Sequence, residues 1–255
     1  MRRIGAIMLW DVQQGLRNRF MRVFALACLG GGSALLAAAP GREVLPMLLI
    51  QAILLIGSLF AMLIGWGNGQ QTRAQGPFLF AQPVSAGELI VGQLLGTGGW
   101  CLLLLLLFMS PAALRAGMPQ TLAALAALGA GLVLVCVLGG LVIGLAAPPV
   151  SGLLAVLLAW LVAVAGWEVG LLLLTETTPI VEAPELFIGL LLLNPAGTFR
   201  IAAMVGLEAV PFDAEELQSG RLVFEHVGVA ATAIFAGWLA LLLGSGIRAV
   251  SREER

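Results

Sequence analysis

The sequence predicts an all-α polytopic membrane protein with six transmembrane helices, and three observations support this prediction. Of the 255 residues, 60% are hydrophobic and only 11% are charged, and the mean hydropathy is +1.04. Water-soluble domains do not have this composition. Apolar runs of about the 20 residues needed to cross a bilayer lie at 20–39, 46–66, 88–109, 121–147, 152–174 and 226–247. Residues 1–255 are therefore expected to form a single transmembrane domain.

The N-terminal segment, residues 1–19, predicts an interfacial helix rather than a cleaved signal. Apolar residues recur near helical spacing, and polar residues occupy much of the opposite side. Asp11 belongs to the polar side, which is expected to face water. The arginines that precede the first long apolar run do not fit the layout of a secretory signal. The apolar set is Ile4, Ile7, Met8, Val12 and Leu16; the polar set is Arg2, Arg3, Asp11, Gln13, Gln14 and Arg17.

The arginines predict that both termini lie on the cytoplasmic side. With the N-terminus inside, nine arginines fall on the inner side and four on the outer side, as the positive-inside rule requires. The inner set is Arg2, Arg3, Arg17, Arg19, Arg22, Arg73, Arg248, Arg252 and Arg255; the outer set is Arg42, Arg115, Arg200 and Arg221.

A polar break at 70–76 separates the second and third runs, and residues 67–87 are predicted to form a cytoplasmic loop. Ser85 and Glu88 have the spacing of a capping box, in which each side chain binds a free backbone N–H of the other's residue. This pattern predicts that the third span starts just after Ser85. The fourth and fifth runs are separated only by Pro148-Pro149, which predicts a tight hairpin.

The external segment, residues 175–225, contains one apolar piece, Leu186–Leu193, that is too short to cross a membrane. Asn194 as N-cap and Pro195 at the first helical position predict a second short helix through Phe199 and Arg200. Two short helices meeting at this turn would form a re-entrant pair shielded by other helices. The alternative is an ordinary external loop with one buried apolar strand or helix.

Side chains for catalysis or metal binding are scarce in this sequence. His226 is the single histidine, and the cysteines Cys28, Cys101 and Cys136 lie in three separate runs without metal-ligand spacing. Small apolar packing is their expected role. Glu168 is the one acid well inside an apolar run, where a carboxylate is costly. A structural interfacial role and a role in an external gate remain open for it.

Several glycines within the apolar runs have the small-xxx-small spacing that permits close helix contact. They support helix packing or a dimer face without choosing between the two. These glycines are Gly92, Gly96 and Gly99 in the third run, and Gly140 and Gly144 in the fourth. The sequence contains no phosphate-binding G-x-x-x-x-G-K-[ST] motif, so any nucleotide chemistry must belong to a partner.

Residues 75–93, which include the loop between the second and third spans, resemble the coupling segment of type-2 ABC transporter permeases. Gly76 and Pro83 match the family pattern, whereas Gln75, Pro77 and Gln93 stand where the family has an acid, a threonine and a lysine. The resemblance implies a short coupling helix that docks on a cytoplasmic ATPase, mainly through the apolar side chains of the loop. The implied coupling residues are Arg73, Gln75, Gly76, Phe78, Leu79, Phe80, Pro83, Ser85 and Glu88.

Two further segments resemble a subgroup of these permeases, the NosY family of the copper-processing transporters that mature nitrous oxide reductase. One is Asp11–Phe20, and the other is Leu190–Glu208, which holds a leucine run, Asn194-Pro195 and Phe199-Arg200 in order. This segment and Glu168 give the candidate external gate, which consists of Glu168, Asn194, Pro195, Phe199 and Arg200.

The resemblance implies a transport subunit in the bacterial inner membrane, with no catalytic site or bound cofactor of its own. Such a permease works as a homodimer with two ABC ATPase subunits, which bind ATP and Mg²⁺, and with a periplasmic partner protein. It couples ATP hydrolysis to export or to mechanical signalling. An ion-coupled carrier and an intramembrane enzyme are the alternatives, although the spans lack the midplane charges or paired catalytic residues that these require.

Overall fold

The computed structural model describes residues 2–15, 19–38, 44–76, 84–116, 119–177, 184–206 and 226–253. Every element in these ranges is helical. Five helical segments are long and apolar enough to cross a membrane: Val44–Ala74, Ala86–Pro111, Leu122–Ala146, Pro149–Leu174 and Val227–Ser251. A shorter apolar helix, Met21–Leu35, precedes them. The predicted all-α membrane class is confirmed.

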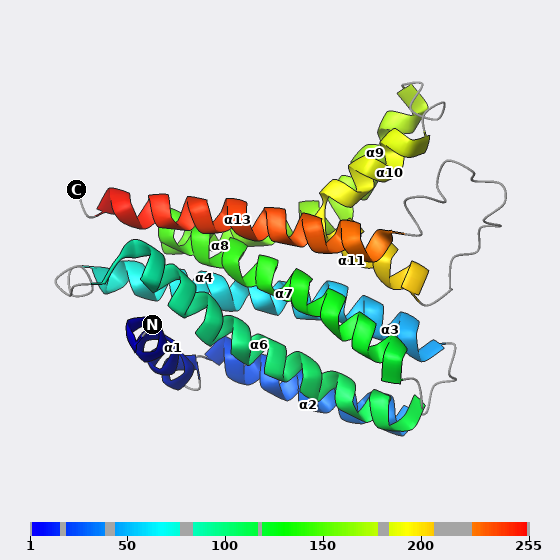
Figure 1. Ribbon diagram of the computed structural model, residues 1–255, viewed down its shortest axis with the longest axis horizontal. Coiled ribbons are helices and arrows are strands. Elements are labelled where there is room, and N and C mark those ends of the chain that lie inside the picture. The colour runs from blue at the N-terminus through cyan, green and yellow to red at the C-terminus, as the bar shows by residue number, and fades with distance from the viewer. Residues whose placement is uncertain are drawn as a thin grey trace.

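In the described residues, six helical passes run along the bundle, the five long apolar segments and the shorter α2. The passes are α2 (Arg19–Ala38), α3–η1–α4 (Val44–Ala52, Ile53–Gly57, Ser58–Ala74), α6 (Ala86–Ala116), α7 (Pro119–Ala146), α8–η2–α9 (Pro149–Leu161, Val162–Gly166, Trp167–Thr177) and α13 (Val227–Glu253). The elements η1 and η2 are π-helical turns inside otherwise α-helical passes. Figure 1 shows α2 beside α6 and places the end of α4, the start of α6 and the end of α13 at one end of the bundle, the end at which α1 lies.

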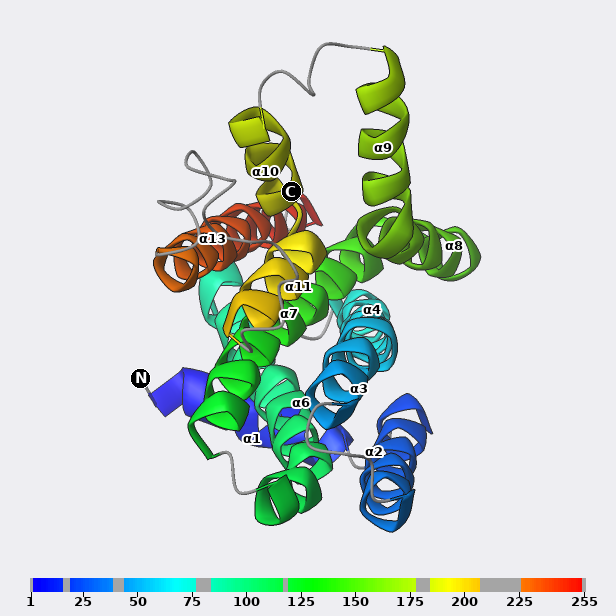
Figure 2. The ribbon, with the colours of Figure 1, turned by 90° about the vertical axis from the view of Figure 1, so that its right-hand side faces the viewer.

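Helix α1 (Arg2–Gly15) lies across the bundle rather than along it, as Figure 2 shows. It packs against α6, where Gly92 and Gly96 allow close approach. A Cβ atom added at Gly92 would lie 2.7 Å from Ile7, and one at Gly96 would lie 2.7 Å from the Asp11 carboxylate. The predicted helix in the N-terminal segment is confirmed, and two of the three predicted glycines on α6 make a helix contact. Gly99 has nothing within 4 Å of its Cβ position.

The centre of the bundle is the pair formed by α4 and α7, whose backbones touch at glycines. A Cβ atom at Gly65 or Gly140 would overlap a carbonyl oxygen of the other helix, that of Val137 or Met62. Gly144 meets Gly69 one turn further along, with 3.0 Å between an added Cβ and the Gly69 Cα. Small residues at i and i+4 on both helices permit this approach. The predicted role of Gly140 and Gly144 in close packing is confirmed.

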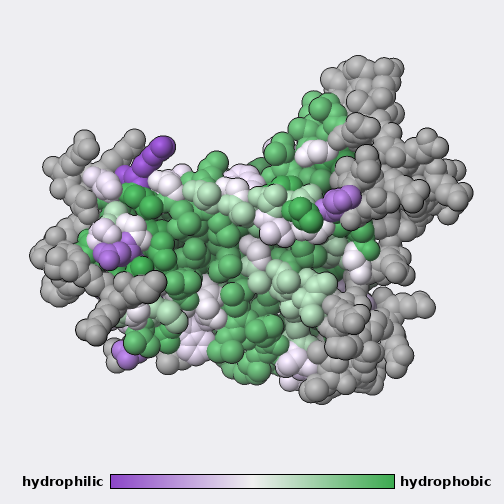
Figure 3. Space-filling view, in the orientation of Figure 1, coloured by the Kyte–Doolittle hydropathy of each residue, from purple (hydrophilic) through white to green (hydrophobic). Residues whose placement is uncertain are grey.

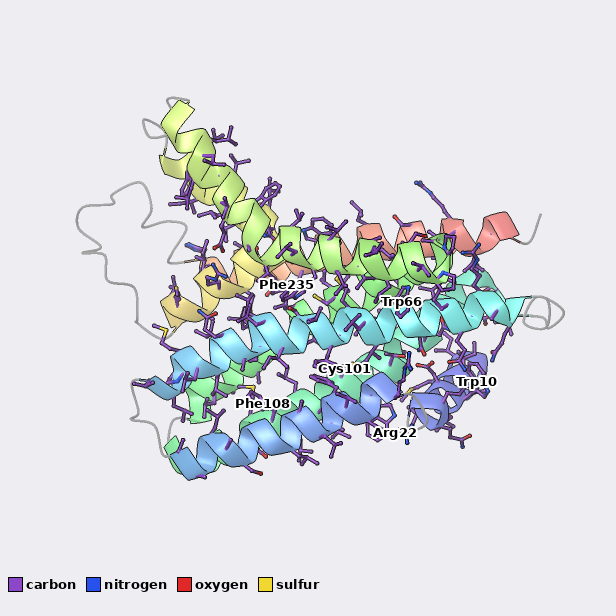
Figure 4. All side chains as sticks on the ribbon, turned by 180° about the vertical axis from the view of Figure 1, so that it is seen from behind. Trp10, Arg22, Trp66, Cys101, Phe108 and Phe235 are labelled. Atoms are coloured by element: carbon purple, nitrogen blue, oxygen red, sulfur yellow. The ribbon has the colours of Figure 1, made fainter. Side chains whose placement is uncertain are left out.

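The remaining core is apolar and lies on both sides of this pair. Phe24 of α2 stacks on Phe60 of α4, with 5.1 Å between ring centroids. Cys101 is fully buried between the helices, and Phe108 of α6 points toward α2 (Figure 4). The three cysteines are free thiols, in agreement with the predicted packing role.

The predicted loop 67–87 is shorter in the structure. Helix α4 continues to Ala74, and Gln75 is its C-cap. The prediction that residues 67–74 belong to a loop was therefore wrong. The polar side chains that suggested a break are satisfied inside the bundle: Gln70 Nε2 donates to the carbonyl oxygens of Gly144 at 2.8 Å and Ala147 at 2.7 Å. Buried polar groups with partners do not interrupt a membrane helix.

The segment before the last pass forms a bent helix pair. Helices α10 (Pro184–Leu193) and α11 (Pro195–Gly206) meet at 114°. Because α9 ends and α13 begins at the same end of the bundle, the pair between them enters and returns (Figure 1). This confirms the predicted re-entrant pair, and the alternative of an ordinary loop was wrong. Helices α9 and α10 together lean away from the bundle, and we call them the arm (Figures 1 and 2).

On the face drawn in Figure 3, the described surface of the bundle is mainly apolar, and its most hydrophilic residues lie toward the ends. Large apolar side chains are exposed along α8 and α13, including Val150, Leu154, Leu158, Val229 and Leu241. In water such a surface would cause aggregation, whereas in a bilayer it contacts lipid. The predicted lipid environment follows from this surface and from the length of the helices.

Candidate functional site

Two groups of polar side chains are buried or half-buried near opposite ends of the bundle. The first, which we call the α1 joint, consists of Asp11, Asn68, Thr72, Gln93 and Thr97 and connects α1, α4 and α6. The second, which we call the arm cluster, consists of Glu168, Asn194 and Arg200 and connects η2, α9 and α11. Buried polar groups in a membrane protein are costly, so both groups are candidate functional sites.

In the α1 joint, Asp11 is held by donors from two different passes. Asn68 Nδ2 on α4 donates to Asp11 Oδ1 at 2.6 Å, and Thr97 Oγ1 on α6 donates to Asp11 Oδ2 at 2.5 Å. Asn68 also donates to Thr97, so each of the three side chains is hydrogen-bonded to the other two. One turn along the same faces, Gln93 Nε2 of α6 donates to Thr72 Oγ1 of α4. Helices α4 and α6 are therefore linked to each other and to α1.

Two contacts outside this set strengthen the attachment of α1. Trp100 Nε1 of α6 donates to the carbonyl oxygen of Val12 at 3.1 Å, and Gln71 of α4 donates to the Gln14 side chain. The side chains of Asp11 and Gln14 thus face the bundle, whereas that of Gln13 is exposed.

The position of Asp11 corrects the sequence prediction. Its side chain was expected to face water but is only 2% exposed. The interaction with Asn68 and Thr97 explains the difference, because these donors replace water at a carboxylate that would otherwise be unsatisfied. Burial raises the pKa of the Asp11 carboxyl to about 6, and the hydrogen bonds from Thr97 and Asn68 act in the opposite direction.

The structure describes five of the nine predicted coupling residues. Ser85 and Glu88 form the predicted capping box: Glu88 N donates to Ser85 Oγ at 3.2 Å, and Ser85 N donates to Glu88 Oε2 at 3.0 Å. Arg73 is exposed at the end of α4, Gln75 is the C-cap and Gly76 is buried. The remaining four, Phe78, Leu79, Phe80 and Pro83, lie outside the described residues.

Gln93, where the resembled family has a lysine, has a structural explanation. Its side chain is 2% exposed and binds Thr72 inside the α1 joint. A lysine ammonium at the same depth would carry a charge that neutral Thr72 cannot compensate. The amide is therefore suited to this position, although its Oε1 atom has no hydrogen-bond partner among the described residues.

In the arm cluster, Asn194 holds the turn between α10 and α11. Its Oδ1 accepts from the N–H of Ala196 at 3.1 Å, which is the predicted N-cap interaction with Pro195 at the first helical position. Its Nδ2 donates to the carbonyl oxygen of Ala163 at 2.5 Å. Ala163 lies in the π-helical turn η2, where the wider hydrogen-bond pattern is often found at functional positions.

Glu168 and Arg200 form an ion pair that joins α9 to α11. The side chains are 28% and 24% exposed, respectively, and the buried Arg200 Nε has no hydrogen-bond partner in the part of the chain that the structure describes. Phe199 is fully buried beside them. The structure thus brings Glu168, Asn194, Pro195, Phe199 and Arg200 to one region, as the predicted external gate requires.

Tryptophan side chains bind the backbone at the end of α10. Trp167 Nε1 donates to the carbonyl oxygen of Leu190 and Trp238 Nε1 to that of Leu193, both at 2.9 Å. The last carbonyls of a helix have no partner within the helix. Two indoles from α9 and α13 supply partners at the point where the chain bends.

Sequence reasoning missed the α1 joint and these indole contacts. Asn68 and Thr72 are four residues apart, as are Gln93 and Thr97, so each pair lies on one face of its helix. Two polar residues at this spacing in an apolar helix were the signal from which buried polar partners could have been predicted. Among the described residues, no group of three or more His, Cys, Asp or Glu side chains could hold a metal ion.

The sequence matches no protein-family model and no curated protein. What can be stated about this protein at this point therefore rests on its fold. The chain is an integral membrane protein. It crosses the membrane several times as an all-helical bundle.

Proposed function

We propose that this protein is the permease subunit of a type-2 ABC transporter in the bacterial inner membrane. It works as a homodimer with two ABC ATPase subunits, which bind ATP and Mg²⁺. The order of elements supports this proposal: a crosswise N-terminal helix, six passes and a re-entrant pair before the last one. This order is the layout of the family that residues 75–93 resemble.

The α1 joint is the observation that carries the proposal. The connection from Gln75 to Ser85 leaves α4 and enters α6, and both helices are bound to α1 by the hydrogen bonds of the joint. The capping box fixes the start of α6. A force applied to this short connection by an ATPase is therefore passed to three helices at once, which is what a coupling segment must do.

The arm cluster supports the second half of the proposal, transmission to the opposite face. The ion pair of Glu168 with Arg200 and the bond from Asn194 to Ala163 join the re-entrant pair to the fifth pass. A change of angle in that pass would move α10 and α11. We infer that these helices form the external gate or the contact for a periplasmic partner, in export or in copper-enzyme maturation.

Co-purification and ATPase assays test the proposal. The protein, expressed in its native membrane and extracted in a mild detergent, should retain an ABC ATPase in stoichiometric amount. Gly76→Ala and Pro83→Ala should insert normally and retain the ATPase but lose stimulation of ATP hydrolysis by the permease. Gln13→Ala, an exposed position on α1 at the same end, is the matched control and should behave as wild type. Absence of an ATPase, or full stimulation in the Gly76 and Pro83 variants, would contradict the proposal.

A further inference from the structure

The carboxyl group of Asp11 is buried among neutral partners. Its hydrogen-bond donors are the Asn68 amide and the Thr97 hydroxyl, at 2.6 Å and 2.5 Å. Burial of a carboxylate without a cation leaves much of its desolvation cost uncompensated. A bound proton removes that cost, because the neutral acid needs no counter-charge.

The charged and titratable groups on the surrounding helices do not compensate Asp11. Among the described side chains, the group on α4 is Arg73, those on α6 are Glu88 and Cys101, and those on α2, which packs along α6, are Arg19, Arg22 and Cys28. Arg115 belongs to the far end of α6, and its side chain lies outside the described part. Within the described part of the chain, Asp11 makes its interactions with Asn68 and Thr97, and none of these groups forms an ion pair with it. The side chains of Arg2 and Arg3 on α1 lie outside that part.

On the side of α6, the Asp11 carboxylate lies directly against the helix backbone. A Cβ atom on Gly96 would lie 2.7 Å from Asp11 Oδ2 and 2.8 Å from Asp11 Cβ, so the side chain rests on the backbone of α6. The joint also lacks hydrogen-bond donors, since the buried Gln93 Oε1 has no partner among the described residues. A proton on Asp11 adds a donor, and the Thr97 hydroxyl can rotate to accept it.

We propose that Asp11 is a proton-binding site and that its occupancy sets how firmly α1 is held on α4 and α6. The inference does not depend on the ABC transporter proposal, since it concerns the docking of one helix. Burial raises the pKa of Asp11 from 3.8 to about 6, so the docked state binds the proton more tightly than the undocked state. Proton binding to Asp11 therefore stabilises the docked position of α1 fully below pH 3.8, and this stabilisation is lost as the pH rises through 6.

Carboxyl NMR of the whole protein measures the proton directly. The chain contains only two aspartates, Asp11 and Asp213, so labelling with [¹³Cγ]aspartate gives two side-chain signals. Asp213→Asn assigns them by removing one. In lipid nanodiscs the Asp11 signal should titrate near pH 6. Titration of that signal at pH 4 or below would overturn the proposal, and this measurement needs no change at Asp11.

Hydrogen exchange of residues 2–15, corrected for intrinsic pH dependence, measures the docking of α1. Protection in the wild type should fall about tenfold between pH 5 and pH 7, the change expected for a shift of the pKa from 3.8 to about 6. Asp11→Asn, a neutral isostere of the protonated acid, should remain protected at both pH values. Gln13→Glu, which places a carboxyl group at an exposed position of α1, is the matched control and should follow the wild type. A flat wild-type profile, or the same fall in Asp11→Asn, would overturn the proposal.

Discussion

The contact between α4 and α7 makes a sharp prediction for Gly140→Ala. The added methyl group would overlap the Met62 carbonyl oxygen and lie 2.9 Å from both the Met62 carbonyl carbon and the Trp66 amide nitrogen. These are backbone atoms, so no rotamer change relieves the overlap and the two helices must separate. Forced overpacking of this kind costs about 1–3 kcal/mol, and separation also removes the packing on which membrane helix association depends.

Gly139→Ala is a control on the adjacent residue of the same helix. Its added methyl group would have its nearest neighbours at 3.9 Å, the side-chain ends of Leu242 and Met62. Both substitutions gain the same helix propensity, about 0.5–1 kcal/mol for alanine over glycine. The control should therefore be unchanged or slightly stabilised, and the difference between the variants isolates the helix contact.

Unfolding in mixed micelles with increasing SDS gives the free energy for both variants. We expect Gly140→Ala to be less stable than Gly139→Ala by about 2 kcal/mol or more. Equal stability of the two variants would refute the close approach of α4 and α7.

Four further substitutions test the arm cluster and the capping box. Glu168→Gln and Arg200→Gln should each destabilise the protein in the same SDS assay, and the double variant should lose less than the sum because neither charge is left unpaired; additive losses would contradict the ion pair. Asn194→Ala removes the hydrogen bonds to Ala163 and Ala196 and should lower the free energy of unfolding by about 1–3 kcal/mol. Hydrogen exchange in residues 184–206 should become faster, and unchanged exchange there would contradict the role of Asn194 in holding the turn. Ser85→Ala should cost about 1 kcal/mol and increase exchange at the start of α6, whereas Ser245→Ala, which removes a hydroxyl inside α13, provides the comparison.

The layout of the membrane helices could be predicted from the sequence because long apolar runs have few alternatives to crossing a bilayer. The bend at Asn194-Pro195 was also predictable, since capping and the missing N–H of proline act locally. The capping box of Ser85 and Glu88 was predictable for the same reason. In each case the residues that determine the structure lie within one or two turns of each other.

The α1 joint could not be predicted in this way because its partners are distant in the sequence. Asp11 binds side chains 57 and 86 residues away. Composition places Asp11 on the polar side of α1 and places Gln70 and Thr72 in a break, since polar residues at the end of an apolar run ordinarily meet water. The structure satisfies them inside the bundle, and this reversed both predictions. Helical spacing of the polar residues was the local sign of these contacts.

The tight contacts also determine which parts of the molecule can move relative to one another. Helix α4 is fixed to α7 by backbone contact and to α1 and α6 by buried hydrogen bonds, so these four helices behave as a rigid block. The arm joins α8 through the π-helical turn η2, and its other attachments are the ion pair of Glu168 with Arg200 and the bond from Trp238 to the backbone of α10. We expect the arm to change its angle to this block at η2, where Asn194 binds the carbonyl oxygen of Ala163. A small rotation at Ala163 therefore becomes a larger displacement at the far tip of α9 and α10.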